Sequence, residues 1–146
     1  MRVALRLPKA ARTVIVTDAQ AAWPNEACGL LIGQRTAAGD TQIIEAVPSA
    51  NCAPEEARAK AFEIDPALLL RLHRELRGSD REIVGHYHSH PNGRAELSAR
   101  DRAEAWTPGF VWLVVALQAG EVTDWAAFLH RSGDDFPLLD LVDGEG

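Results

Sequence analysis

The stretch Glu82–Asp101 (EIVGHYHSHPNGRAELSARD) carries the pattern on which the fold and the chemistry of this chain depend. Its first part, residues 82–87, is typical of a β-strand. His86, His88 and His90 follow one another at every second position, and side chains two residues apart in an extended chain project to the same face. Pro91 ends this pattern. We therefore expect at least two of the three imidazoles to share one site.

The second half of the stretch predicts a short helix that turns back toward these histidines. Ser98 is a typical N-cap residue, and Asp101 lies one helical turn further on, on the same face. The seven residues 91–97 form the connecting loop. His88, His90 and Asp101 would then converge, and two imidazoles with one carboxylate are the donors of a catalytic zinc site that keeps an open fourth position.

Such a site also needs a group that takes a proton from water and returns it to the leaving amine. Glu26 is the best placed candidate, because it precedes the apolar run at residues 27–34 (ACGLLIGQ), which we expect to be a buried strand. A lone His-x-His pair is weak evidence, since strands carry it by chance. The same pair followed by Ser-x-x-Asp and preceded by Glu-x-Cys-Gly is far more specific.

The whole chain, residues 1–146, is expected to form a single domain of mixed secondary structure. Helices are predicted at residues 9–22, from the Asp65–Pro66 cap to Gly78, and at residues 98–106. Strands are predicted at residues 3–7, 27–34, 41–47, 59–64, 82–87, 110–117, 122–130 and 136–142. Because strands and helices do not alternate strictly, we favour a mixed β-sheet with helices packed against it, an α/β or α+β fold.

Composition excludes several classes of protein. The 146 residues carry a formal net charge of -6 and no basic run, which argues against a nucleic-acid partner. The longest apolar stretch, residues 110–117, is shorter than the ~20 residues of a membrane-spanning helix. Arg2 and Arg6 interrupt the only apolar patch near the N-terminus. We therefore expect a cytoplasmic protein without a membrane partner, either a monomer or a weak dimer.

Together these residues resemble the motif of the JAMM (JAB/MPN-plus) zinc metallopeptidases, a family whose domains are similar in length to this chain. The resemblance rests on Glu26-Ala27-Cys28-Gly29, His88-Ser89-His90-Pro91, Ser98 and Asp101. It implies a cytidine-deaminase-like MPN architecture and one catalytic Zn²⁺ ion bound by His88, His90 and Asp101. It also implies that Glu26 is the general base and proton shuttle, and that Ser98 hydrogen-bonds the developing oxyanion.

The resemblance further implies a substrate. Members of the family hydrolyse the peptide or isopeptide bond after the C-terminal Gly-Gly of ubiquitin-like proteins, and the compact prokaryotic type resembles processors of ubiquitin-like or sulfur-carrier proteins. We expect the tail of such a protein to bind by adding a strand to an exposed sheet edge. Two alternatives stay open: a non-catalytic scaffold of the same fold that binds a protein partner, and an amidohydrolase of small conjugates. Leu97, where many relatives have proline, leaves the rigidity of the loop open.

Several other residues have more than one interpretation. Cys28 and Cys52 form no disulfide framework and are expected to be thiols, although a bridge between them stays possible. His86 falls outside the ligand pattern and is expected to support the site, and Asn51 either binds substrate or forms a turn. Surface positions are expected for His73 and His130, and packing roles for Trp106, Trp112, Trp125 and Phe128.

Overall fold

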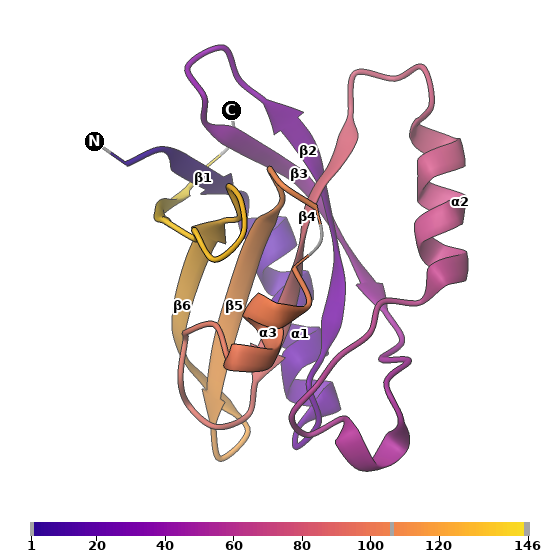
Figure 1. Cartoon of the computed structure of the whole chain (residues 1–146), viewed down its shortest axis with the longest axis vertical. Helices are drawn as coiled ribbons and strands as arrows, with labels where there is room; N and C mark the ends of the chain where they lie inside the picture. The colour runs from indigo at the N-terminus through magenta and orange to yellow at the C-terminus, as the bar shows by residue number, and fades with distance from the viewer. Residues whose placement is uncertain (1, 106, 145–146) are drawn as a thin grey trace.

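A curved sheet wrapped around one long helix forms the body of the protein (Figure 1). The computed structural model describes residues 2–105 and 107–144. Within them the strands are β1 (Ala4–Leu7), β2 (Cys28–Arg35), β3 (Thr41–Ser49), β4 (Glu82–His90), β5 (Val111–Gln118), β6 (Glu121–Leu129) and β7 (Leu138–Asp143). The helices are α1 (Lys9–Ala22), α2 (Pro66–Leu76) and α3 (Ala99–Ala103), with a 3₁₀ turn at Glu55–Ala57.

The strands are arranged in the order β1-β3-β2-β4-β5-β6-β7, and β7 pairs again with β1. The pairs β1–β3, β1–β7 and β4–β5 are parallel, whereas the other neighbours are antiparallel. The predicted mixed sheet with helices is therefore confirmed. The closure of the sheet into a barrel was not predicted, because it depends on parallel pairing between the two ends of the chain.

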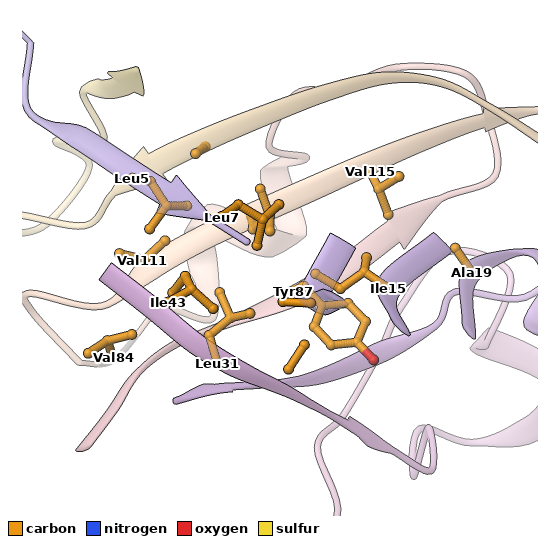
Figure 2. Close-up of a cluster of buried hydrophobic side chains, with 14 of the residues drawn as sticks. Leu5, Leu7, Ile15, Ala19, Leu31, Ile43, Val84, Tyr87, Val111 and Val115 are labelled. Atoms are coloured by element: carbon orange, nitrogen blue, oxygen red, sulfur yellow. The ribbon is translucent and has the colours of Figure 1, made fainter. Parts of the chain in front are cut away.

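Helix α1 packs against one face of this sheet and forms the main core with it. Its buried residues Ala11, Ile15 and Ala19 lie on one side of the helix. Figure 2 shows Ile15 and Ala19 beside Tyr87, among aliphatic side chains from several strands. The labelled strand residues are Leu5, Leu7, Leu31, Ile43, Val84, Val111 and Val115, and all are fully buried.

Helices α2 and α3 lie on the opposite face of the sheet. Leu72 of α2 packs with Leu30, Ile32 and Ile83 in a separate apolar cluster. In a second cluster on this face, Leu97 packs with Trp112, Val114, Phe128 and Phe136, and it is only 8% exposed. Burial of Leu97 thus anchors the loop before α3 in place of a proline. In Figure 1, α1 lies behind the sheet and α3 in front of it.

A β-bulge in β4 decides which side chains face each side of the sheet. Leu31 of β2 pairs with Gly85, and the next residue, Ile32, pairs with Ile83, so Val84 is an extra residue on β4. Val84 and Tyr87 consequently belong to the core around α1. Ile83 packs on the opposite face, toward α2. The strand itself extends three residues beyond the predicted end, because β5 pairs with it as far as His90.

Local signals predicted the helices well and one strand wrongly. Helix α1 has the predicted bounds, and the Asp65 side chain caps α2 by accepting a hydrogen bond from the Ala67 N–H. The predicted strand at residues 59–64 is wrong, since only Ile64 forms an isolated bridge, to Asn51. The third helix ends at Ala103, which is earlier than predicted. Trp106, the last residue of the predicted helix, lies outside the described residues. None of the helices in the described part has the length and apolarity needed to span a membrane.

Candidate metal centre

Three side chains on the face of the sheet opposite α1 meet at their donor atoms. The Nε2 atoms of His88 and His90 lie 3.0 Å apart. The Oδ2 atom of Asp101 lies 3.2 Å from the first and 3.1 Å from the second. In a tetrahedral site with metal–ligand distances of about 2.0–2.1 Å, the ligand atoms are about 3.3–3.4 Å apart. The observed triangle therefore fits a Zn²⁺-sized ion with shifts of a few tenths of an ångström.

The position of Asp101 follows from the way α3 begins. Ser98 Oγ accepts a hydrogen bond from the Asp101 N–H at 3.0 Å, and Asp101 Oδ2 accepts one from the Ser98 N–H at 2.9 Å. This reciprocal capping box fixes the carboxylate relative to the helix axis. The same oxygen points at both histidines, so the cap also holds a potential metal ligand in place.

Glu26 lies beside the two histidines although it is far from them in sequence. The pairing of β2 with β4 places Cys28 opposite His88, which brings the residues just before β2 next to His90. One donor atom each from Glu26, His88 and His90 lie within 4.8 Å of one another. The Glu26 side chain is buried, and its Oε1 atom has no hydrogen-bond partner among the described residues. A buried oxygen without a partner at this point indicates a place for water or a ligand.

Ser89 is a positioning residue that the sequence patterns did not reveal. It lies between the two histidines but points to the other face of β4, where it is fully buried. Its Oγ accepts a hydrogen bond of 2.7 Å from the Ala27 N–H, and its own N–H donates to the Ala27 carbonyl. Glu26 is held on its other side by its N–H, which donates to the Arg58 carbonyl at 2.7 Å. The segment carrying Glu26 is thus tied to the histidine strand.

Burial and close partners set the ionisation of the cluster. Desolvation raises the pKa of Glu26 to about 8. Burial would also raise the pKa of Asp101, but hydrogen bonds from His88 and His90 hold it well below its ordinary value. Burial lowers the pKa of His88. For His90, burial acts in the same direction, but the Asp101 carboxylate outweighs it and raises the pKa. Asp101 is therefore the permanent negative charge of the cluster.

Aromatic side chains cover the buried side of the histidine row. The Phe62 ring stacks on the His88 ring, with centroids 4.4 Å apart. Trp112 meets the His86 ring edge-on at 4.2 Å. His86 is buried, its Nδ1 atom has no hydrogen-bond partner among the described residues, and burial lowers its pKa to about 3. His86 thus lies in the same row as the cluster without contributing a donor atom to it.

Two cavities adjoin the cluster. One, of about 430 Å³, is lined by Glu26, His90 and Ser98 of the cluster together with Lys60. The other, of about 450 Å³, lies further along β4 and is lined by His86, Phe62, Phe110 and Trp112, with charged residues at its rim. The first cavity is lined by side chains that could take part in a reaction. The second adjoins it through Phe62 and the histidine row.

Asn51, a candidate for substrate binding, makes contacts within the protein instead. The amide nitrogen of Asn51 donates to the carbonyls of Glu26 and Ala61, and its side-chain oxygen accepts from the N–H groups of Ala53 and Glu63. Asn51 therefore ties the residues before β2 to the segment at residues 59–64. Because its side chain already makes four hydrogen bonds, it has little capacity left to bind substrate.

The prediction for the two outer histidines is half right. His73 is exposed on α2, as expected. His130, expected at the surface, is buried, with Nδ1 3.3 Å from the Thr107 carbonyl oxygen and Nε2 3.1 Å from that of Gly133. Its ring stacks on Phe136 at 4.6 Å. Two loops fold over the end of β6 and bury this ring. Strand periodicity does not predict this burial, because it results from tertiary packing.

The cysteines are both free thiols. Cys28 is buried, and its Sγ lies 3.7 Å from the Ala50 carbonyl oxygen, whereas Cys52 is exposed. Desolvation raises the pKa of Cys28 to about 12, so this thiol stays protonated and unreactive near neutral pH.

Of the predicted packing residues, Trp112 and Phe128 are buried and Trp125 is partly buried, while Trp106 lies outside the described residues.

Comparison with known proteins shows which family the sequence resembles. The model of a family described as prokaryotic homologs of the JAB domain matches residues 8–128. Among curated proteins, a desampylase from Haloferax volcanii is 33% identical over 121 residues, which cover 82% of this chain and 78% of that protein.

Several solved structures are similar to this one. A protein from Desulfitobacterium hafniense, determined in solution, has a TM-score of 0.82 at 27% identity and covers 97% of this chain and 94% of its own. One from Salinibacter ruber has a TM-score of 0.70 at 27% identity, covering 96% and 91% of the two chains. A JAB1/MPN domain protein from Archaeoglobus fulgidus, at 16% identity, TM-score 0.56 and coverage of 97% and 98%, shares the fold.

Proposed function

The chain belongs to the family of prokaryotic homologs of the JAB domain, and from this premise we propose that it is a zinc-dependent peptidase. Its substrate would be the peptide or isopeptide bond after the C-terminal Gly-Gly of a ubiquitin-like or sulfur-carrier protein. The convergence of His88, His90 and Asp101 with Glu26 is the observation that carries the proposal. Similarity to a desampylase supports deconjugation of a ubiquitin-like protein as the type of reaction.

We assign His88, His90 and Asp101 as the protein ligands of one Zn²⁺ ion. The near-equal separations of their donor atoms support this set, because each pair lies close to the edge length of a tetrahedral site. His90 Nδ1 lies 3.0 Å from the Arg94 carbonyl oxygen, which orients the ring with Nε2 toward the ion. When bound, Zn²⁺ would polarise the scissile carbonyl and bring the pKa of water down toward 7.

Glu26 is assigned as the general base and proton shuttle. Its unpartnered Oε1 lies in the buried cluster, close enough to the ligands for one water molecule to fit between them. Its Oε1 accepts no hydrogen bond from the described residues, so it is free to accept a proton from a water molecule at this point and to release it again. Glu26 would take a proton from the attacking water and pass it to the leaving amine.

Ser98 is assigned as the donor to the oxyanion. Its Oγ accepts from the Asp101 N–H, so the hydroxyl hydrogen remains able to donate into the cavity that Ser98 shares with Glu26 and His90. A fixed donor of this type lowers the barrier by about 3 kcal/mol in acyl-transfer enzymes. Ser98 would therefore act twice, once as a helix cap and once on the substrate.

An extended tail has a place to bind next to these groups. The Phe62 ring covers His88, and no hydrogen bond among the described residues uses the main-chain N–H or C=O of Phe62. A tail aligned with this segment would form strand-like main-chain hydrogen bonds, the mode expected from the sequence. Glycines suit the narrow stretch at the cluster, since they bring no side chain toward Phe62.

The deciding experiment measures cleavage of a ubiquitin-like carrier extended past Gly-Gly, followed by mass spectrometry. We expect Glu26→Gln to lower kcat by about 10²–10⁴-fold without loss of zinc, because it removes proton transfer alone. Glu55→Gln, an exposed glutamate of the 3₁₀ turn, is the matched control and should cleave like the wild type. Full activity of Glu26→Gln would contradict the assignment. Inertness of the zinc-loaded wild type toward every Gly-Gly carrier would contradict the proposed reaction.

A further inference from the structure

The cavity beyond the cluster has features that the proposed chemistry does not use. It measures about 450 Å³, and the rings of Phe62, Phe110 and Trp112 form its walls. His86 lies between these rings, 92% buried, and no hydrogen bond among the described residues reaches either of its ring nitrogens. Buried polar groups in native proteins are nearly always hydrogen-bonded. An unpaired imidazole in an aromatic cavity therefore points to a ligand with a hydrogen-bonding group.

The charges at the rim indicate the kind of ligand. Arg100 of α3 and Glu104, which follows the last residue of that helix, form an ion pair of 3.3 Å and cancel each other. Glu63 also lines the cavity, and it makes no ion pair within the described part of the chain. The rim thus has one uncompensated negative charge. Aromatic faces attract cations, and a guanidinium group can both stack on rings and donate hydrogen bonds.

The position of Glu26 fixes which side of the substrate reaches this cavity. Glu26 must hand its proton to the leaving amine, so the leaving group lies on its side, in the cavity shared with His90 and Ser98. The acyl side of the substrate then extends in the opposite direction along the histidine row, past His88 toward His86. The ring centroids of these two histidines are 6.2 Å apart. That distance corresponds to about two residues of an extended chain.

We propose that this cavity is a specificity pocket for an arginine or lysine side chain on the residue immediately before the Gly-Gly of the substrate tail. The inference rests on the proposed function, which it deepens by naming a feature of the substrate. The cation would lie among Phe62, Phe110 and Trp112, donate to His86 at the base of the pocket, and face Glu63 at the rim. The two glycines would span the distance from the pocket to the cleaved bond.

The test compares carriers that differ only in the residue before Gly-Gly: arginine, leucine or glutamate. We expect kcat/KM of the wild type to be about tenfold higher for arginine than for leucine, with glutamate poorest. Glu63→Lys should lower kcat/KM for the arginine carrier more than for the leucine carrier, so that most of this preference disappears. Glu55→Lys, the same charge reversal on a glutamate outside the cavity, should keep the preference. Equal kcat/KM for all three carriers would overturn the inference and leave the proposed function standing.

A binding measurement separates the two proposals if no carrier is cleaved. Short peptides ending in Arg-Gly-Gly or Leu-Gly-Gly are titrated into zinc-loaded Glu26→Gln protein by calorimetry. Tighter binding of the arginine peptide, by about tenfold, that Glu63→Lys abolishes would support the pocket even without turnover. Equal affinities would overturn the pocket independently of the reaction. Phe110→Leu gives a second check, since loss of one aromatic wall should reduce the preference while the fold is kept.

Discussion

The two faces of the nine-residue strand β4 have different roles. The face toward α1 presents Val84, Tyr87 and Ser89, which are fully buried and either apolar or hydrogen-bonded to fixed partners. The opposite face presents the histidine row, where buried nitrogen atoms lack partners or crowd one another. The first face has the features of a stable core. The second carries unsatisfied polar groups, as functional sites do, so the fold and the candidate site can be disturbed separately.

The largest effect is expected from a change against the core face. Gly29 of β2 lies directly against the Tyr87 ring, and any Cβ there would overlap the ring and the Val47 carbonyl. Gly29→Ala should therefore lower the free energy of unfolding by about 3 kcal/mol or more, measured by urea denaturation. A stable variant with normal zinc affinity would show that the sheet can yield at this point.

On the histidine face, a loss of metal binding should leave the fold intact. We expect His90→Ala to weaken Zn²⁺ binding by about 100-fold or more, because two donors remain where three are needed. Chelator competition measures the affinity, and near-UV circular dichroism of the metal-free protein checks the fold. His73→Ala, on the exposed face of α2, is the control. Unchanged zinc affinity in His90→Ala would exclude His90 as a ligand.

Ser89 belongs to the core face but should affect both properties. In Ser89→Ala the buried Ala27 N–H loses its acceptor, which should cost about 2 kcal/mol of stability in thermal unfolding. The segment carrying Glu26 would also loosen, so kcat should fall more than zinc affinity does. A fall in stability with unchanged kcat would limit Ser89 to the fold.

The smallest effect is expected for Tyr87→Phe. Its hydroxyl donates a 2.6 Å hydrogen bond to Asp18 of α1, which is only half-buried and can bind water instead. We expect a loss of about 1 kcal/mol in the free energy of unfolding and no change in zinc affinity. Weaker zinc binding in this variant would show that the two faces of β4 are coupled.

Sequence patterns predicted most of the local structure, for reasons visible in particular residues. The apolar spacing of residues 9–22 and the Asp65–Pro66 cap are local signals, and both helices form where these signals lie. Alternation likewise predicted that the histidines share a face. The Ser98–Asp101 cap needed only a helical turn, and the structure has it.

What the sequence did not reveal depends on contacts between distant segments. The extra residue at Val84 shifts the alternation along β4, and no local motif marks it. The proximity of Glu26 to His90 was expected only from a family resemblance, because it follows from the pairing of β2 with β4. Residues 59–64 have strand-like composition, but the side chain of Asn51, rather than a strand ladder, binds the Ala61 carbonyl and the Glu63 N–H.

The double use of Asp101 has a thermodynamic consequence. A helix of five residues is marginal by itself, and one carboxylate oxygen both completes its cap and faces the two histidines. Ordering of α3 and occupancy of the site are then linked functions, and each must favour the other by the same free energy. Arg100 and Glu104 lie on or next to this helix and line the neighbouring cavity, so the order of that cavity wall would depend on the same equilibrium. Amide hydrogen exchange at residues 99–104 would thus serve as a gauge of metal loading.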